Sequence, residues 1–151
     1  FNAMMNRVTL PLDCEMLRIG EPETDDPIAQ IRDSYLAALR ATVAEPRMRR
    51  VFEIALFKVE HGDPALRDVH QRRLEGQRER VASIERGLRR AARRGLWRSA
   101  LPPRVAALGL VSLVEGLFTN WMTDPGAFDL VRVGAQAIDA YLRGLQAPAG
   151  A

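Results

Sequence analysis

The fold class follows from one stretch of sequence, residues 64–94, which reads PALRDVHQRRLEGQRERVASIERGLRRAARR. Seven of its residues recur at steps of three or four and form one stripe: His70, Leu74, Gln77, Val81, Ile84, Leu88 and Ala91. A mean step of about 3.5 residues is the period of a helix packed along a seam. The sequence therefore predicts a long helix, which ends at Gly95 because glycine is typical of the position after a helix.

Proline and glycine divide the rest of the chain into further helical segments. Asp26 and Pro27 form an N-cap followed by a proline in the first turn. No stretch alternates with a period of two, so strands are not expected. The prediction is an all-α helical bundle of about six helices, the first interrupted by Pro11: residues 1–19, 27–44, 46–60, 64–94, 102–123 and 128–145.

Composition excludes several classes of protein. A chain of 151 residues that is 47% hydrophobic suits one domain with its own core, and it excludes a disordered or collagen-like chain. The single cysteine, Cys14, cannot form an internal disulfide, which points to a reducing compartment. No leader peptide opens the chain, and its longest uncharged run, Val105 to Val114, is too short to cross a bilayer. We therefore expect a cytoplasmic protein with no membrane partner.

Arginine is concentrated in the middle of the chain. Residues 47–104 hold sixteen basic and seven acidic residues. Such a balance suits either a nucleic-acid surface or a long helix with a solvated face. We favour the solvated helix, because glutamates lie within one or two turns of arginines, as Glu85 does of Arg89, and no aromatic residues interleave with them to stack on bases.

The sequence offers little for catalysis or metal binding. His61 and His70 are the only histidines, and neither has a second histidine or a cysteine at ligand spacing. There is no glycine-rich phosphate loop, no nucleophile elbow and no cysteine paired with a histidine. We therefore predict no catalytic residue, no metal, no cofactor and no enzyme.

The helix over residues 102–123 is apolar on nearly every side and needs more than one partner surface. The last helix, residues 128–145, is also rich in apolar residues, so the two together suggest a homodimer with a four-helix interface. One carboxylate, Glu115, interrupts the apolar helix, and a buried acid has to be paired, protonated or used. Packing within one copy explains the predicted interface residues nearly as well: Leu113, Leu117, Trp121, Ile138 and Leu142.

Three blocks of sequence resemble one family of regulators. Residues 49–60, RRVFEIALFKVE, resemble the R-R-x-x-E-I-L-x-x-K-x-E helix of the TetR family of bacterial transcriptional repressors, in its AcrR-like subgroup. Residues 91–102, AARRGLWRSALP, resemble the family's A-x-x-R-G-x-L-P connection. Residues 113–130, LVEGLFTNWMTDPGAFDL, resemble its D-G-L-x-x-x-W-L-x-x-P-x-x-F-D-L stretch. The resemblance spans roughly residues 27–145, with the blocks in the family's order.

The resemblance implies a division of the chain. TetR-type proteins read DNA with an N-terminal helix-turn-helix, whereas this chain opens on FNAMM, which resembles the start of the linking helix that follows it. We therefore expect residues 1–26 to be a linking-helix region that leads from a missing DNA-binding domain. Residues 27–146 would form the effector-binding and dimerisation domain, and residues 147–151 a frayed tail. Operator DNA would be bound only through the missing domain.

The resemblance also implies a function. The AcrR-like subgroup typically controls drug-efflux genes. In the family, a small ligand changes the relative placement of the two DNA-reading heads, so the affinity of the repressor for operator DNA falls. A rival interpretation is a free-standing helical homodimer with a structural or adaptor role, and a weaker rival is an enzyme built in a helical bundle. An upstream helix-turn-helix in frame would separate the first two, and turnover of a substrate would favour the third.

The resemblance places a ligand pocket between the first helix and the helices over residues 46–60, 64–94 and 102–123. A polar residue on a buried stripe is more often hydrogen-bonded within the core than bound to a ligand. Here two such residues, His70 and Gln77, face the carboxylate of Glu115, which favours a pocket. Relatives often have polar residues where this chain has Phe52 and Leu56, so the expected effector is hydrophobic or aromatic, including cationic compounds that Glu115 could receive. The predicted ligand-binding residues are Phe52, Leu56, Val59, His70, Gln77, Val81, Glu115 and Phe118.

Overall fold

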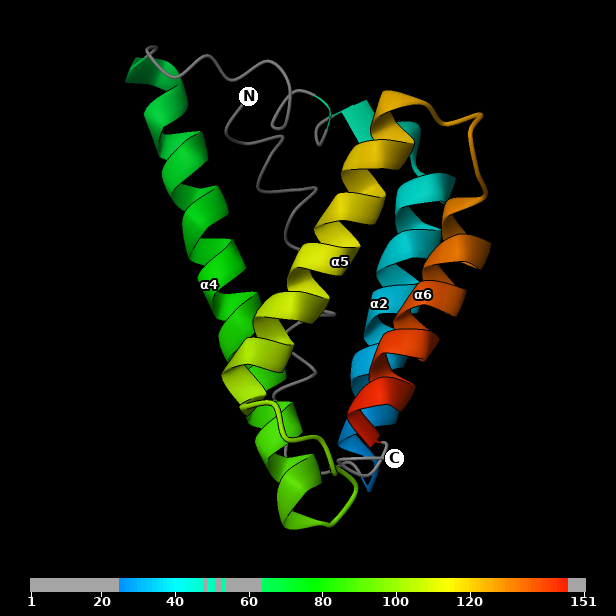
Figure 1. Ribbon diagram of the computed structural model, residues 1–151. Helices are drawn as coiled ribbons and strands as arrows, with labels where there is room; N and C mark the ends of the chain where they lie inside the picture. Colours follow the sequence, from blue (N-terminus) through cyan, green and yellow to red (C-terminus); the bar gives the residue numbers. More distant parts are fainter. Residues whose placement is uncertain (1–24, 48, 51–52, 54–63, 147–151) are drawn as a thin grey trace.

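The computed structural model describes residues 25–47, 49–50, 53 and 64–146, and Figure 1 shows their arrangement. No strand occurs within these ranges, which confirms the all-α prediction. Four helices are defined there: α2 (Pro27–Ala44), α4 (Pro64–Arg93), α5 (Pro103–Thr123) and α6 (Leu130–Gln146).

Each of these helices begins and ends within two residues of its predicted bounds. The predicted helix over residues 46–60 is represented by helical residues 46–47, 49–50 and 53. The predicted helix over residues 1–19, the rest of residues 46–60 and the tail lie outside the described residues. The total of about six helices therefore stays a prediction.

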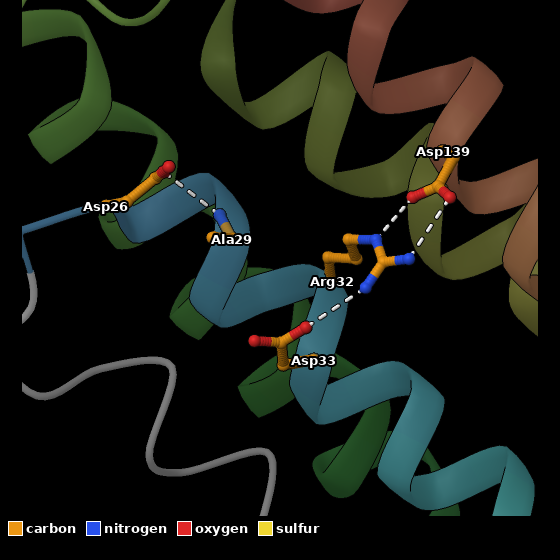
Figure 2. Close-up of polar contacts among 5 residues, drawn as sticks. All are labelled: Asp26, Ala29, Arg32, Asp33 and Asp139. Carbon is orange, nitrogen blue, oxygen red and sulfur yellow. Dashed lines mark hydrogen bonds and ion pairs between the residues drawn. The ribbon is translucent and has the colours of Figure 1, made fainter.

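The boundaries of α2 and α4 have the local causes that the sequence indicates. The carboxylate of Asp26 accepts hydrogen bonds from the backbone N–H groups of Ile28 and Ala29, at 3.1 and 3.0 Å, so it caps the start of α2. Figure 2 shows the bond from Ala29. At the end of α4, Gly95 adopts a positive φ of 73°. The N–H of Leu96 then reaches back to the carbonyl of Ala91 at 2.9 Å, as in a Schellman motif.

The helices pack in a closed order: α4 against α5, α5 against α6, α6 against α2, and α2 against α4. In Figure 1, α2 and α6 lie side by side, and α5 runs between this pair and α4. Large apolar side chains from all four helices are fully buried where they meet. The core includes Ile31, Leu39, Ile84, Leu88, Leu110, Leu130 and Ile138.

The predicted inward stripe of α4 is confirmed only over its C-terminal half. Val81 and the stripe residues after it are buried, whereas Gln77 is half-buried and His70 is exposed. The prediction that His70 faces inward is therefore wrong. In Figure 1, α4 and α5 approach each other toward the end of α4 and diverge toward its start, so the first turns of α4 lie away from the other described helices.

By length and composition alone, α5 could cross a membrane. Seven of its side chains are buried against the neighbouring helices, which is the position of a core helix. Its apolar circumference is therefore largely used for packing, as the sequence predicts. The exceptions are Val105 and Leu108, which are 49% and 44% exposed.

Two glycines allow helices to approach closely. A Cβ atom at Gly109 of α5 would collide with the hydroxyl of Tyr141 on α6, and that hydroxyl donates a hydrogen bond of 2.8 Å to the carbonyl of Ala106. A Cβ atom at Gly134 of α6 would collide with the side chain of Leu39 on α2. Both contacts of α6 with its neighbours thus depend on the absence of a side chain.

An ion pair also joins α2 to α6. The guanidinium of Arg32 donates to both carboxylate oxygens of Asp139, at 2.5 and 3.2 Å, and to Asp33 on its own helix at 3.2 Å (Figure 2). The hydrogen bond from Arg32 holds the pKa of Asp139 below its ordinary value. The side chains of Arg32 and Asp139 are 38% and 32% exposed, so solvent screens the pair and its net stabilisation is about 1 kcal/mol or less.

Substitution of Gly134 by alanine tests the close approach of α6 to α2. The added methyl group has to displace Leu39 from its place in the core, and overpacking of this kind costs about 1–3 kcal/mol. Gly144→Ala is the matched control on the same helix, because a Cβ atom there meets nothing within 4 Å. Thermal unfolding should show lower stability for Gly134→Ala and unchanged or slightly higher stability for Gly144→Ala. Equal stability of the two variants would contradict the packing described.

Candidate functional site

The carboxylate of Glu115 on α5 contacts two polar side chains of α4. Gln77 donates through Nε2 to Oε2 at 3.4 Å, and Arg80 donates through Nη2 to Oε1 at 3.3 Å. Gln77 and Arg80 are three residues apart and so lie on the same face of α4. Gln77 thus faces the single carboxylate of α5, as the sequence indicates, whereas His70 is exposed.

Arg80 is a member of this cluster that sequence reasoning missed. Its side chain is 26% exposed and that of Glu115 is 37% exposed, so the pair is partly shielded from water. A carboxylate that is shielded from water has to be paired, protonated or used. Glu115 is paired, because Arg80 supplies a positive charge. The sequence contains one signal for this contact: Arg80 follows Gln77 by three residues, so both lie on the face of α4 that is predicted to meet Glu115.

A third helix brings a phenol to the same region. Tyr35 on α2 is only 3% exposed, and its hydroxyl has no hydrogen-bond partner among residues 25–47, 49–50, 53 and 64–146. Burial raises the pKa of Tyr35; the positive charge of Arg80 opposes this rise and the negative charge of Glu115 adds to it. Both charges therefore lie close enough to act on the phenol. The sequence showed Tyr35 only as one residue on the apolar face of α2.

We call Tyr35, Gln77, Arg80 and Glu115 the polar cluster. Its members come from α2, α4 and α5, of which α4 packs against both of the others, and the buried Val81 follows Arg80 directly on α4. A phenol, an amide and a charge pair can bind a ligand through hydrogen bonds. No group of three metal-ligating side chains occurs in the described part of the chain.

The other predicted ligand-binding residues are placed differently. Phe118 is half-buried and packs against the core. His70 is exposed on the first half of α4, away from the buried stripe. Phe52, Leu56 and Val59 lie outside the described residues.

The predicted interface residues divide into two groups. Leu113 and Leu117 are half-buried. Ile138 and Leu142 are 0% and 3% exposed within a single chain, so they have almost no surface left for a second copy. Trp121 is also buried, and the guanidinium of Arg49 lies 5.2 Å from the centre of its ring.

The arginine-rich part of α4 presents mainly exposed side chains. Arg89 donates to the carboxylate of Glu85 at 2.7 and 3.2 Å, the contact one turn away that the sequence predicts, and Arg104 reaches the same carboxylate at 3.4 Å. These hydrogen bonds hold the pKa of Glu85 below its ordinary value. The contacts support a solvated helical face for this segment.

Ionisation of the two tyrosines tests their burial. Burial raises the pKa of Tyr35 and of Tyr141 above the ordinary value of 10.0. The unfolded chain loses these protons near pH 10 while the folded chain keeps them. The free energy of unfolding should therefore be unaffected by these groups below pH 10 and should fall as the pH rises toward the folded-state pKa values.

Ultraviolet absorbance of the phenolate, measured against pH, checks this expectation in the folded and in the urea-unfolded chain. Tyr141→Phe leaves Tyr35 as the only tyrosine, because the chain has two. Phenolate formation near pH 10 in the folded Tyr141→Phe variant would contradict the burial of Tyr35.

Comparison with known proteins gives consistent matches along the chain. Residues 26–147 match the C-terminal region of MAATS-type transcriptional repressors. The HTH-type transcriptional repressor BepR of Brucella suis biovar 1 (strain 1330) is 27% identical over 150 residues, which are 99% of this chain and 71% of BepR. The HTH-type transcriptional regulator AcrR of Shigella flexneri is 32% identical over 120 residues, which are 74% of this chain and 55% of AcrR.

Solved structures show the same fold. The complex of SmeT with triclosan superposes with a TM-score of 0.82 at 28% identity, over 98% of this chain and 72% of the SmeT chain. NalD, the secondary repressor of the MexAB-OprM multidrug efflux pump in Pseudomonas aeruginosa, gives a TM-score of 0.80 at 27% identity, over 97% of this chain and 72% of its own. With these helices in the same arrangement and a family match over residues 26–147, the chain belongs to the TetR family of transcriptional repressors and contains the C-terminal region of a MAATS-type member.

Proposed function

We propose that this chain is the effector-binding and dimerisation part of a repressor, and that a small hydrophobic ligand bound near the polar cluster lowers the repressor's affinity for operator DNA. The carrying observation is the partly shielded contact of Glu115, the one carboxylate of the apolar helix α5, with Gln77 and Arg80 of α4. Ligand sites are commonly of this kind, apolar with a few convergent polar groups. Operator DNA would be bound by the helix-turn-helix domain that the sequence predicts to be missing from this chain.

The relatives support two parts of the proposal: a hydrophobic or aromatic ligand, and the control of efflux genes. SmeT, the repressor of the Stenotrophomonas maltophilia multidrug efflux pump SmeDEF, has been solved with triclosan, a small chlorinated aromatic compound. NalD represses another multidrug efflux pump. We infer that this chain serves in the control of efflux genes and takes a hydrophobic or aromatic effector. The protein would act in the cytoplasm, where its operator lies.

The proposed dimer uses α5 and α6 of each copy. Val105 and Leu108 lie one turn apart on α5 and remain about half exposed. They share the outward face of that helix with Ser112, beside the point where Tyr141 of α6 covers Gly109. Since Ile138 and Leu142 are buried within one copy, we assign the interface to this outward face. Leu113 and Leu117 would lie at its edge.

Dye displacement tests the ligand site. A hydrophobic fluorescent dye is titrated into the chain and then displaced by lipophilic cations and by neutral aromatic compounds. Gln77→Leu and Glu115→Gln should each weaken at least one class of compound about three- to tenfold, as expected for the loss of one hydrogen bond. Gln71→Leu is the matched control, because Gln71 is exposed on the same helix and donates a hydrogen bond of 3.0 Å to Glu75, one turn along α4. Unchanged affinities in both site variants, with the helical content intact, would refute the site.

Sedimentation velocity tests the dimer. We expect the chain to sediment as a dimer at micromolar concentration, and Leu108→Glu to give a monomer because it places a charge in a desolvated interface. Val43→Glu is the matched control, since Val43 is 48% exposed but lies on α2; this variant should stay dimeric. A monomeric parent chain, or a dimeric Leu108→Glu variant, would contradict the assigned interface.

A further inference from the structure

The hydroxyl of Tyr35 differs from those of two other buried residues, Thr42 and Ser83. Thr42, two turns after Tyr35 on α2, donates to the carbonyl of Ala38 at 2.9 Å, and the hydroxyl of Ser83 accepts from Arg86 at 3.0 Å. Tyr141 is less buried than Tyr35 and still donates to a carbonyl. Tyr35 is 3% exposed, and no donor or acceptor of residues 25–47, 49–50, 53 and 64–146 bonds to its hydroxyl. A buried polar group without a partner is unfavourable, so its retention calls for an explanation.

The charges around Tyr35 restrict what could bond to it. Arg80 and Glu115 both act on the phenol, and they are joined to each other at 3.3 Å. The carboxylate of Glu115 is therefore already paired with the positive charge of Arg80. A cationic ligand would have to displace Arg80 before it could pair with Glu115, whereas a neutral ligand would meet no such competition. At neutral pH the phenol stays protonated, so it can donate one hydrogen bond and accept another.

We propose that Tyr35 is the hydrogen-bonding anchor of the ligand site, and that it selects neutral aromatic compounds carrying a hydroxyl or carbonyl group over lipophilic cations. This inference rests on the proposed function and narrows its ligand class. Gln77 and Arg80 of α4 bond to the carboxylate of Glu115, while the buried phenol belongs to α2. The ligand's polar group would then satisfy the hydroxyl that the described protein groups leave unbonded.

A matched set of naphthalene compounds tests the assignment in the 151-residue chain. The three probes are 2-methylnaphthalene, 2-naphthol and 2-naphthylmethylammonium, which share one ring system and differ in the head group. Dissociation constants are measured by dye displacement. The decisive quantity is the ratio of the dissociation constant of 2-methylnaphthalene to that of 2-naphthol, because it cancels the contribution of the shared ring.

Tyr35→Phe should lower this ratio about tenfold and leave the affinity for 2-methylnaphthalene within about twofold of the parent chain. Thr42→Val is the matched control: it removes a buried hydroxyl from the same helix, but one that is already bonded, and the ratio should not change. Arg80→Met should improve binding of the ammonium probe relative to 2-naphthol, since Glu115 loses its positive partner. Arg80→Gln serves the same purpose if circular dichroism shows that the methionine variant has lost its helical content.

The outcomes separate the two proposals. If 2-methylnaphthalene and 2-naphthol bind but Tyr35→Phe leaves their ratio unchanged, Tyr35 is not the anchor, and the proposed function stands. If the parent chain binds the ammonium probe most tightly, the selection against cations is wrong. If none of the three probes displaces the dye from the parent chain, the ligand site of the proposed function fails, and the role of Tyr35 fails with it.

Discussion

The structure depends on the need to cover α5, a helix that is apolar around nearly its whole circumference. No single neighbour can bury such a helix, so α4 packs against one side and α6 against another. α6 can approach α5 closely because Gly109 leaves room for the ring of Tyr141, and it approaches α2 closely because Gly134 leaves room for Leu39. The surface of α5 that remains, around Val105 and Leu108, is the one for which the described chain provides no cover.

The same constraint explains the polar cluster. A carboxylate on an apolar helix loses hydration as its neighbours pack, and this cost is offset only if the neighbours supply charge and hydrogen bonds. α4 supplies both, through Arg80 and Gln77. The result is a charge pair that is neutral as a whole, set beside a phenol from α2 whose hydroxyl is buried. Polar groups of opposite kinds are thus concentrated at one place at the edge of the apolar core.

Much of the fold could be predicted because the signals are local. Asp26 accepts the bonds of an N-cap and Gly95 adopts the left-handed conformation of a helix end, and each needs only its own neighbours in sequence to do so. The stripe of α4 was predicted for the same reason, since periodicity defines a face. It failed at His70 because periodicity does not show along which part of α4 the partner helices pack.

The candidate site and the interface were harder to predict, because both depend on which helices meet. Periodicity could place Gln77 opposite Glu115, but it could not show that Arg80 would reach the same carboxylate or that Tyr35 would be brought beside them from α2. Similarly, Ile138 and Leu142 look alike in sequence whether they face a second copy or their own core. The packing of α6 against α2 decides the question in favour of the core.

The arrangement also gives the proposed coupling a physical basis. Glu115 and Leu108 are seven residues apart on α5 and so lie on one face of it, two turns from each other. One rigid helix would therefore carry both the ligand contact and the dimer contact. Packed helices shift as units, because a close-packed interior cannot deform continuously. α2 carries Tyr35 and, one turn earlier, Arg32, whose ion pair with Asp139 ties it to α6. A ligand that bonds to Tyr35 would therefore act on the two helices assigned to the interface, and it could shift operator affinity only to the extent that it binds one placement of these helices more tightly than the other.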